Sequence, residues 1–498
     1  MSEGGFSMSS QGGGPGRMAW QVRPDNPRWI ALGAFFSALV VLVPAFLSPL
    51  HVVLAVGAIV AVGVVMFCPR RAVMAMVVTA TALPVHLTDT VKIPLGLRPW
   101  EILLLLAAGF VIIDILYRRK WMIVRTQIDG HVLVFLGLTL LSAIVGAMHG
   151  NDTDVILRNV RYPLYFIAFF LATQGVDART VTARFPLLLI VVGACVSAEY
   201  MLEFVGSIDL SAGDRFVRVA RRQGIVLPLS LLMIANHLIH DRQRWRGWLP
   251  PVFVFTGIGF ALTLGRGMWV SFGIGLLVSI WLWQSGQPAQ TRRWWKGGAL
   301  AIGLVGSLVV TILAFQRVTG TSISAHALER SRTFVDYTRD VQVLSRLLNY
   351  ATALQEIAKH PVIGVGQGTE LTAYSFNPET DRYETWKAWT LDSLYLTLWL
   401  KMGLGGLLLF IWLCIRVGRR CLVVFHGTRA PPVRAFVAAV LSTLVAMLVL
   451  GISDGSMING RFAAVIATLM GLVMILPVED RVGDGSAHAD PVRLDTQS

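Results

Sequence analysis

The chain has 498 residues, of which 55% are hydrophobic and only 14% are charged, and its formal net charge is +14. This composition excludes a soluble multidomain enzyme, because apolar stretches long enough to cross a bilayer recur from Ile30 to Leu476. The positive charge does not indicate nucleic-acid binding, since most of it lies in short loops between apolar stretches. The composition therefore predicts an all-α polytopic integral membrane protein.

The apolar stretches predict about 12–14 transmembrane helices in two bundles. A disordered Gly/Ser-rich tail (1–29) comes first, followed by about 11 spans (30–315), a large polar loop (316–390), about 3 further spans (391–476) and a C-terminal tail (477–498). The expected spans are 30–48, 50–67, 72–88, 100–117, 132–148, 158–174, 185–205, 224–240, 249–264, 267–283, 298–315, 391–415, 434–452 and 461–476.

The basic loops set the expected orientation. With these spans, the loops rich in Lys and Arg all fall on one side of the membrane, namely 68–71, 118–125, 241–248, 292–296 and 416–434. The positive-inside rule makes this side cytoplasmic and places both termini there. The sequence contains no phosphate-binding loop, no dinucleotide motif and no set of residues with metal-ligand spacing, so neither a metal nor a cofactor is expected.

Several arginines on the predicted outer side run against this charge rule. One short loop, DRFVRVARRQG (214–224), carries Arg215, Arg218, Arg221 and Arg222. Neighbouring outer span ends carry Arg158, Arg161 and Arg266. Basic side chains are costly near hydrocarbon, and the arginine fork matches phosphate oxygens, so the cluster predicts an anionic substrate on the outer face. The alternatives are contact with anionic lipid headgroups and, for single arginines at helix ends, snorkelling.

Residues 316–390 form one large loop on the predicted outer side, with eight basic and eight acidic residues. Apolar residues recur in it at helical spacing: Val341, Leu344, Leu347, Leu348, Ala351, Leu354 and Ala358. This spacing predicts an amphipathic helix at the outer interface that ends at His360-Pro361. A flexible glycine run, GVGQG (364–368), and a return into a span near Leu391 are expected to follow. The alternative is a tethering loop without chemistry.

Four residues of the predicted outer side are candidates for acid–base chemistry, namely His326, His360, Glu370 and Asp392. Asp392 opens the span after the large loop, and His360 ends the expected amphipathic helix. Either side chain could accept a proton from an attacking hydroxyl. His360 could instead cap the C-terminus of its helix, where the helix dipole favours a cation. His149 also lies near the outer face, without an expected partner.

The outer motifs resemble the O-antigen ligase and Wzy-type polysaccharide polymerase superfamily, over residues 98–476. The similar segments are RNVRYPLYFIAFFL (158–171), GRGMWVSFGIGLL (265–277) and the end of the large loop. That end comprises Arg346, ALQEIAKHPVIGVGQGT (353–369) and DSLYLTLWLKMGLGGLLLF (392–410). Many members of the superfamily carry a His where Asp392 stands here, so a His-based mechanism does not carry over to this position.

The resemblance implies a metal-independent, GT-C-like glycosyltransferase of the bacterial inner membrane. Its donor would be an undecaprenyl-pyrophosphate-linked glycan on the periplasmic face, and its acceptor a sugar hydroxyl of a second glycan. Asp392 or His360 would be the base, and a chain-length regulator is a further expected partner besides membrane lipid. The pyrophosphate would be bound by the outer arginines, namely Arg161, Arg215, Arg218, Arg221, Arg222, Arg266 and Arg346.

We therefore predict an enzyme that polymerises lipid-linked oligosaccharide repeats into exopolysaccharide or O-antigen. One alternative is a ligase of the same superfamily, which would share the donor and the site and differ in the acceptor. Another alternative is a flippase or transporter of lipid-linked glycan. Secondary transporters often contain internal repeats with broken helices in matching positions, whereas this sequence shows no such repeat and has a single large outer loop.

Overall fold

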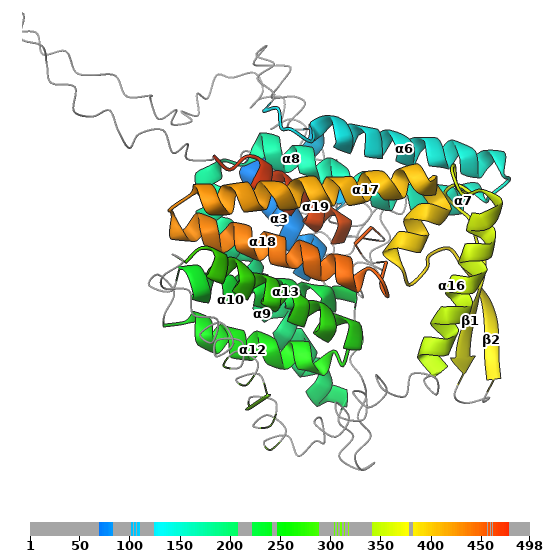
Figure 1. Ribbon diagram of the computed structural model, residues 1–498. Coiled ribbons are helices and arrows are strands. Elements are labelled where there is room, and N and C mark those ends of the chain that lie inside the picture. The colour runs from blue at the N-terminus through cyan, green and yellow to red at the C-terminus, as the bar shows by residue number, and fades with distance from the viewer. Residues whose placement is uncertain are drawn as a thin grey trace, which may run out of the picture. The chain divides into compact units, whose positions relative to one another are not determined.

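The computed structural model describes a large helical part of the chain (Figure 1). Its internal contacts divide the chain into residues 1–64 and 65–498, and every described residue belongs to the second unit. The described ranges are 69–82, 124–207, 222–241, 247–287, 341–377, 382–455 and 462–477, with single positions in 101–109, 303–317 and 457–460. The expected spans 30–48 and 50–67, and most of 100–117 and 298–315, lie outside these ranges.

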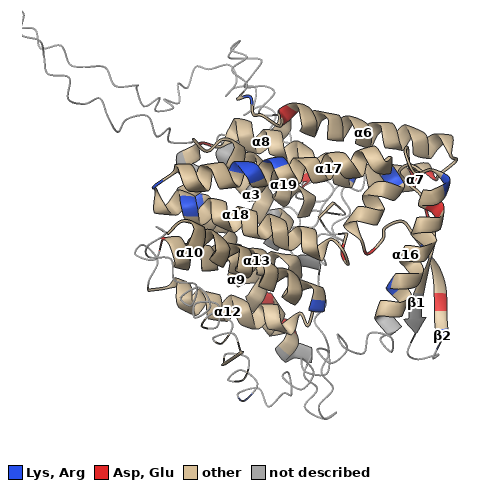
Figure 2. Ribbon diagram, in the orientation of Figure 1, with Lys and Arg blue, Asp and Glu red and all other residues tan. Residues whose placement is uncertain are grey.

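Six helices in the described ranges are long and apolar enough to cross a membrane, which confirms the prediction of a polytopic helical membrane protein. They are α6 (Asp129–Met148), the segment Thr153–Gly175, the part Arg184–Phe204 of α9 (Ala178–Ser207), α13 (Arg266–Ser285), α17 (Leu394–Gly427) and α18 (Pro431–Leu450). Shorter helices are α3 (Pro69–Ala82), α10 (Val226–His240), α12 (Leu249–Leu262) and α19 (Phe462–Met474). Charged residues lie mainly toward the helix ends (Figure 2).

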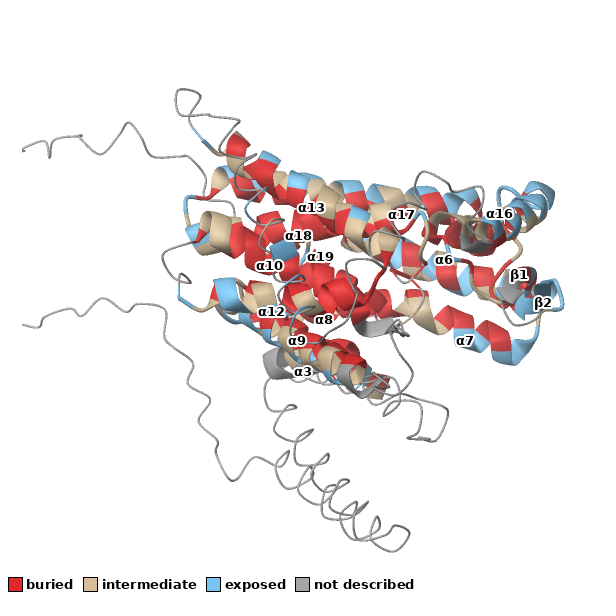
Figure 3. Cartoon of the chain, turned by 90° about the horizontal axis from the view of Figure 1, so that it is seen from below, coloured by how far each residue is buried: buried red, intermediate tan, exposed pale blue. Residues whose placement is uncertain are grey.

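The centre of the described unit is built around α18, which packs against α13, α10 and α17. The residues that face one another here are almost all buried (Figure 3). Aromatic rings join α6, the segment 153–175 and α17, because the Phe135 ring centroid lies 5.1 Å from that of Phe166 and 6.0 Å from that of Phe410. Such a pair contributes about 0.5–1.5 kcal/mol beyond its buried area. This packing fixes the ends of α17, α18 and α13 relative to one another.

The segment Thr153–Gly175 is a broken helix that begins five residues before the expected span 158–174. It consists of α7 (Thr153–Leu164), the 3-10 helix η3 (Tyr165–Ile167) and α8 (Ala168–Gly175). The Asp152 side chain caps α7 by accepting a hydrogen bond from Asp154 N. Pro163 lies inside α7 near the break and lacks the N–H that a continuous helix requires. The break separates the arginine-bearing α7 from the buried α8.

The helix α17 corrects the expectation of a span over 391–415 followed by a basic inner loop over 416–434. It runs for 34 residues to Gly427, so that Arg416, Arg419 and Arg420 lie on its last turns. The helix is kinked at Gly403, whose φ of 68° and ψ of −175° are not helical. Glycine adopts this backbone conformation because it has no Cβ, and the kink divides α17 into a short outer part and a long inner part.

The glycine run 364–368 was expected to be flexible, and the structure shows instead that it is packed into the kink. Val365 N donates a hydrogen bond to Leu400 O (2.7 Å), and Leu404 N donates to Pro361 O (3.2 Å). A Cβ added at Gly364, whose φ is +78°, would lie 2.6 Å from Gly403 N, so the two backbones require glycine to approach this closely. Val365 of the run and Pro361 before it therefore replace helical hydrogen bonds that the kink in α17 opens.

The large loop contains the predicted amphipathic helix, α16 (Val341–Lys359), and a hairpin that was not predicted. Strands β1 (Leu371–Asn377) and β2 (Arg382–Ala388) pair in antiparallel fashion with Leu371 opposite Ala388. Buried residues of α16 pack with β1 and the start of α17, namely Ala353, Ile357, Leu371, Leu391 and Leu400. The opposite face of α16 exposes Leu344, Leu347, Leu348 and Leu354. The end of the bundle that carries α16 and the hairpin is called the outer end below, after the predicted orientation.

Candidate functional site

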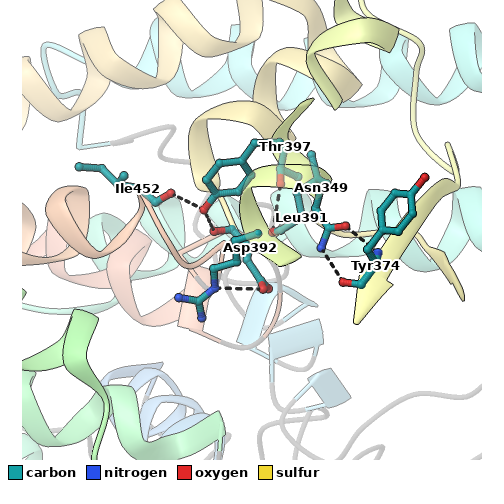
Figure 4. Close-up of polar contacts among 8 residues, drawn as sticks. Asn349, Tyr374, Leu391, Asp392, Thr397 and Ile452 are labelled. Atoms are coloured by element: carbon teal, nitrogen blue, oxygen red, sulfur yellow. Dashed lines mark hydrogen bonds and ion pairs between the residues drawn. The ribbon is translucent and has the colours of Figure 1, made fainter. Parts of the chain in front are cut away.

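The Tyr350 side chain connects α16 to the outer ends of α17 and α18 through hydrogen bonding (Figure 4). The Tyr350 hydroxyl lies 2.9 Å from the main-chain oxygens of both Asp392 and Ile452, and its single proton is donated to one of them at a time. Burial raises the pKa of Tyr350, and the Asp392 carboxylate raises it further, while Arg346 lowers it. The hydroxyl therefore remains a donor at neutral pH. Asn349 fastens the hairpin in the same way, since its Oδ1 accepts from Tyr374 N at 2.7 Å.

These contacts bring two of the predicted site residues together. Arg346 of α16 lies with its Nε 3.6 Å from Oδ2 of Asp392, just before α17 (Figure 4). Their side chains are 43% and 64% exposed, and an exposed ion pair of this kind contributes only about 0–1 kcal/mol. An anionic ligand can therefore replace Asp392 as the partner of Arg346 at little cost in free energy. The pair places a guanidinium, a group suited to phosphate oxygens, beside a carboxylate, a group able to accept a proton.

The start of α13 abuts the same outer end. A Cβ added at Gly267 would lie 3.0 Å from Ser453 Oγ and 3.3 Å from Leu450 Cδ1, so the first turn of α13 touches the loop that follows α18. This loop also provides Ile452 O to Tyr350. Arg266 is the first residue of α13 and is half-buried, at a helix N-terminus whose dipole favours an anion. Leu264, in the turn before it, has a φ of +45°, which strains a branched side chain.

Arg161 is held by a buried carboxylate that the sequence did not link to it. Its Nη1 lies 3.5 Å from Oε2 of Glu101, whose side chain is 4% exposed. The Tyr165 hydroxyl donates to the other oxygen of Glu101. A buried carboxylate is costly without such partners, so Arg161 is needed to stabilise Glu101 in the structure as it stands.

Of the remaining outer arginines, the structure describes the side chain of Arg158 alone. Arg158, on α7, lies with its guanidinium carbon 4.2 Å from the centre of the Trp389 ring, a cation–π contact that joins α7 to the end of the large loop. Arg215, Arg218 and Arg221 lie outside the described residues, and of Arg222 only the backbone is described, as the first residue of η4 (Arg222–Ile225).

His360 lies at the opposite end of α16 from the Arg346–Asp392 pair. Tyr350, which contacts Asp392, precedes His360 by ten residues, a separation of about 15 Å along a helix. His149, at the C-terminus of α6, was expected to have no partner, but its ring centroid lies 5.0 Å from that of His360. The two candidate bases, Asp392 and His360, therefore belong to different sites, and Asp392 is the one beside an arginine.

A buried lysine was missed by the sequence reasoning. Lys401, on the outer part of α17, is 5% exposed, and its Nζ donates to Oδ1 of Asn159 on α7 at 2.6 Å. Both residues line a small cavity together with Gln367 and Thr397. A single lysine inside an otherwise apolar span was the available signal, because ionisable residues within a membrane are rare and functional by default. Its partner could not be read from the sequence, since 242 positions separate the two residues.

The comparison with family models matches residues 251–411 to the O-antigen ligase family. The matched segment runs from α12 to the middle of α17 and contains Arg266, Arg346, His360 and Asp392. No curated protein matches the chain. The match covers two of the segments whose resemblance the sequence indicated, 265–277 and the end of the large loop up to 410, and it does not extend to 158–171. Over this segment the chain is similar to the O-antigen ligase family, which supports the resemblance to the superfamily that the sequence motifs indicated.

Proposed function

We propose that the protein is a glycosyltransferase that polymerises undecaprenyl-pyrophosphate-linked oligosaccharide repeats on the periplasmic face of the bacterial inner membrane. Both termini would lie in the cytoplasm. The observation that carries the proposal is the pairing of Arg346 with Asp392 at the outer end of a domain of this family. A transferase of this kind requires a cation for the departing pyrophosphate and a base for the incoming hydroxyl, and the pair contains both groups.

The proposed reaction needs no energy source besides the donor. The acceptor hydroxyl oxygen attacks the anomeric carbon of the donor glycan, and the bond between that carbon and the pyrophosphate oxygen breaks. Asp392 takes the proton of the attacking hydroxyl. Arg346 and Arg266 stabilise the charge that develops on the lipid pyrophosphate as it leaves. Arg161, Arg215, Arg218, Arg221 and Arg222 are proposed as further ligands of the same pyrophosphate.

The position of α16 supports this assignment of roles. The helix lies over the outer ends of α17 and α18, fastened by the Tyr350 hydroxyl. Its exposed leucines, including Leu347 and Leu354, suit contact with the lipid surface from which the donor would arrive. A helix in this place would also limit access of water to the transferred glycan, and hydrolysis would be slowed.

Reconstitution tests the proposal directly. The purified protein in liposomes receives a lipid-pyrophosphate-linked repeat unit as the sole glycan, with and without EDTA. We expect a ladder of longer glycans on the lipid carrier, unchanged by EDTA because arginines supply the positive charge. Recovery of single repeats alone, in reactions where the protein is shown to be folded, would contradict polymerisation.

A ligase is the second candidate, because the matching family model is described as O-antigen ligase. A ligase would use the same donor and the same arginines and would transfer the glycan to a different acceptor. Adding a lipid A–core acceptor to the liposomes separates the two functions. Product that forms only with this acceptor, as a single transfer, would identify a ligase.

A further inference from the structure

A buried lysine, Lys401, lies beneath the outer end, at a point where three elements meet. Lys401 belongs to the outer part of α17, seven residues after its first residue, which is about 10 Å along the helix. Its Nζ donates to Oδ1 of Asn159 on α7 at 2.6 Å. The third element is the packed run 364–369, which contributes Gln367 to the same cavity.

Around this cavity, one buried acceptor has no hydrogen-bond partner among the described residues. Asn159 uses both ends of its amide, since Nδ2 donates to Val155 O at 2.9 Å while Oδ1 accepts from Lys401. Gln367 donates through N to Ser142 O (2.9 Å) and through Nε2 to Ser142 Oγ (3.1 Å). Gln367 is 1% exposed, and its Oε1 has no partner among the described residues. A buried acceptor without a donor costs about 1–3 kcal/mol, so this oxygen indicates a missing contact.

The cavity supplies the room for that contact. Its volume is about 10 Å³, enough for one water molecule, and its lining includes Lys401, Asn159, Gln367 and Thr397. An ammonium group has three hydrogens, and Asn159 accepts one of them. A water in the cavity can accept a second hydrogen from Lys401 and donate one of its own to Gln367 Oε1. This arrangement satisfies the one unpaired acceptor.

Packing alone does not explain a lysine at this position. Within the described residues Lys401 forms no salt bridge, and a charge inside an apolar span is costly. Apolar residues of similar size are commonly as stable or more stable in such places, whereas a hydrogen bond fixes one geometry. The elements joined here carry the groups of the outer site. Asn159 precedes Arg161 on α7, and Lys401 follows Asp392 into α17.

We propose that Lys401 is a positioning residue for the transfer reaction, and that its ammonium bonds directly to Asn159 and through one water to Gln367. This bridge holds α7, α17 and the run 364–369 in the one arrangement that sets Arg158 and Arg161 relative to Asp392. The role in the reaction rests on the proposed function, while the bridge itself does not.

The first test compares Lys401→Met with Asn236→Leu, a matched loss of a buried hydrogen-bonded side chain elsewhere in the bundle. Asn236 donates to Ser279 Oγ at 2.9 Å, between α10 and α13. Hydrogen exchange of the amides in 364–369 reports the arrangement of the run, since Val365 and Gln367 are hydrogen-bonded to α17 and α6. We expect faster exchange there only in Lys401→Met, with a roughly 100-fold loss of kcat/KM for the lipid-linked donor. Wild-type exchange and kcat/KM in Lys401→Met would overturn the proposal.

The second test separates positioning from packing. In Lys401→Met combined with Asn159→Leu, both partners of the hydrogen bond become apolar, which restores stability. The positioning role predicts that the melting temperature recovers while kcat/KM stays low. Recovery of both quantities would show that Lys401 only fills space.

The third test asks whether Gln367 faces Lys401. It is a double-mutant cycle that combines Gln367→Glu with Lys401→Met. The new carboxylate has a counter-charge when Lys401 is present and is buried alone in the Lys401→Met background. We expect Gln367→Glu to lower the melting temperature far more in that background than in the wild type. Equal effects in both would overturn the bridge. If the wild-type protein transfers no glycan, the proposed function fails, while the exchange and melting-temperature results still decide whether the bridge exists.

Discussion

Arg346 and Arg161 both contact carboxylates at the outer end, but their surroundings differ. Arg346 and Asp392 are largely exposed, at 43% and 64%, so the pair opens at little cost. Arg161 faces Glu101, which is 4% exposed and also accepts from Tyr165. Removing Arg161 would leave a buried charge without its partner, which commonly costs about 3–5 kcal/mol. Loss of function in an Arg161 variant could therefore arise from misfolding as well as from weaker substrate binding. Substitutions of Arg346 and Asp392 test the site without this ambiguity.

Substitution of either residue of the exposed pair should strongly reduce transfer without affecting folding. We expect Asp392→Asn to lower the transfer rate about 10²- to 10⁴-fold, as loss of a general base does. Arg346→Ala should lower it about 10²- to 10³-fold through lost charge stabilisation. The matched control is Lys387→Ala, which removes an exposed outer cation whose Nζ lies 3.5 Å from Glu370 Oε2. Normal glycan products from both site variants, at equal protein levels, would refute the assignment.

The Tyr350 hydroxyl should contribute to stability in a way that depends on pH. Tyr350→Phe should lower the free energy of unfolding by about 0.5–1.5 kcal/mol, the contribution of one hydrogen bond. Burial raises the pKa of Tyr350 in the folded protein. Above about pH 10 an unfolded tyrosine loses its proton first, and ionisation then favours the unfolded chain. The advantage of the wild type over Tyr350→Phe should thus be constant near neutral pH and shrink above pH ~10. An advantage that grows with alkalinity in denaturant titrations would contradict this account.

Among the elements, the kinked helix α17 and the run packed against it determine the shape of the outer end. Val365 N reaches Leu400 O only because Gly403 interrupts the helix. Gly403 has the nearly glycine-only combination of φ 68° and ψ −175°. A Cβ added there would lie 2.0 Å from Val362 O. The kink and the run are therefore one structural unit that carries Asp392 on one side and His360 on the other.

Two neighbouring glycines test this unit as a matched pair. Gly403→Ala should destabilise the protein by about 1–3 kcal/mol from backbone strain, in addition to the steric clash, and should reduce transfer. Gly405→Ala meets no atom within 4 Å and should be neutral or stabilise the helix by up to about 1 kcal/mol. The measurement is the melting temperature in detergent together with hydrogen exchange of 364–369. Equal effects of the two substitutions would show that the kink is not required.

The sequence predicted the elements that have a strong local pattern. Hydropathy located α6, α13, α18 and α19 to within a few residues, and helical spacing located α16, because these signals come from neighbouring positions. The hairpin at 371–388 was missed, since six of the seven residues of β2 are exposed and the strand therefore lacks a buried face with an alternating pattern. The glycines of GVGQG predict a flexible run, because glycine alone does not show whether another backbone lies against it. Its packing depends on Leu400 and Ser142, which no local pattern identifies.

For the whole molecule, six long apolar helices in the described residues confirm the prediction of a multi-pass membrane protein. The family match at 251–411 supports the predicted resemblance to the O-antigen ligase superfamily over that segment. The candidate site was only partly predictable. Residue types suggested Arg346 and Asp392, whereas their contact required α16 to return across the bundle. Lys401 and Asn159 meet across 242 positions, so only the folded chain shows their bond. Orientation in the membrane and the identity of the acceptor stay predictions.

The central claim is that the protein joins lipid-linked repeats, and a deletion strain tests it most directly. The measurement is the size distribution of surface and released polysaccharide, together with the glycans that remain on the lipid carrier at the periplasmic face. We predict single repeat units on the carrier there and no long polymer, both reversed by the wild-type gene and not by Asp392→Asn. Full-length polymer stranded on the carrier would identify a ligase, and repeats held on the cytoplasmic face would identify a flippase. Unchanged polysaccharide and carrier-linked glycan would contradict the account.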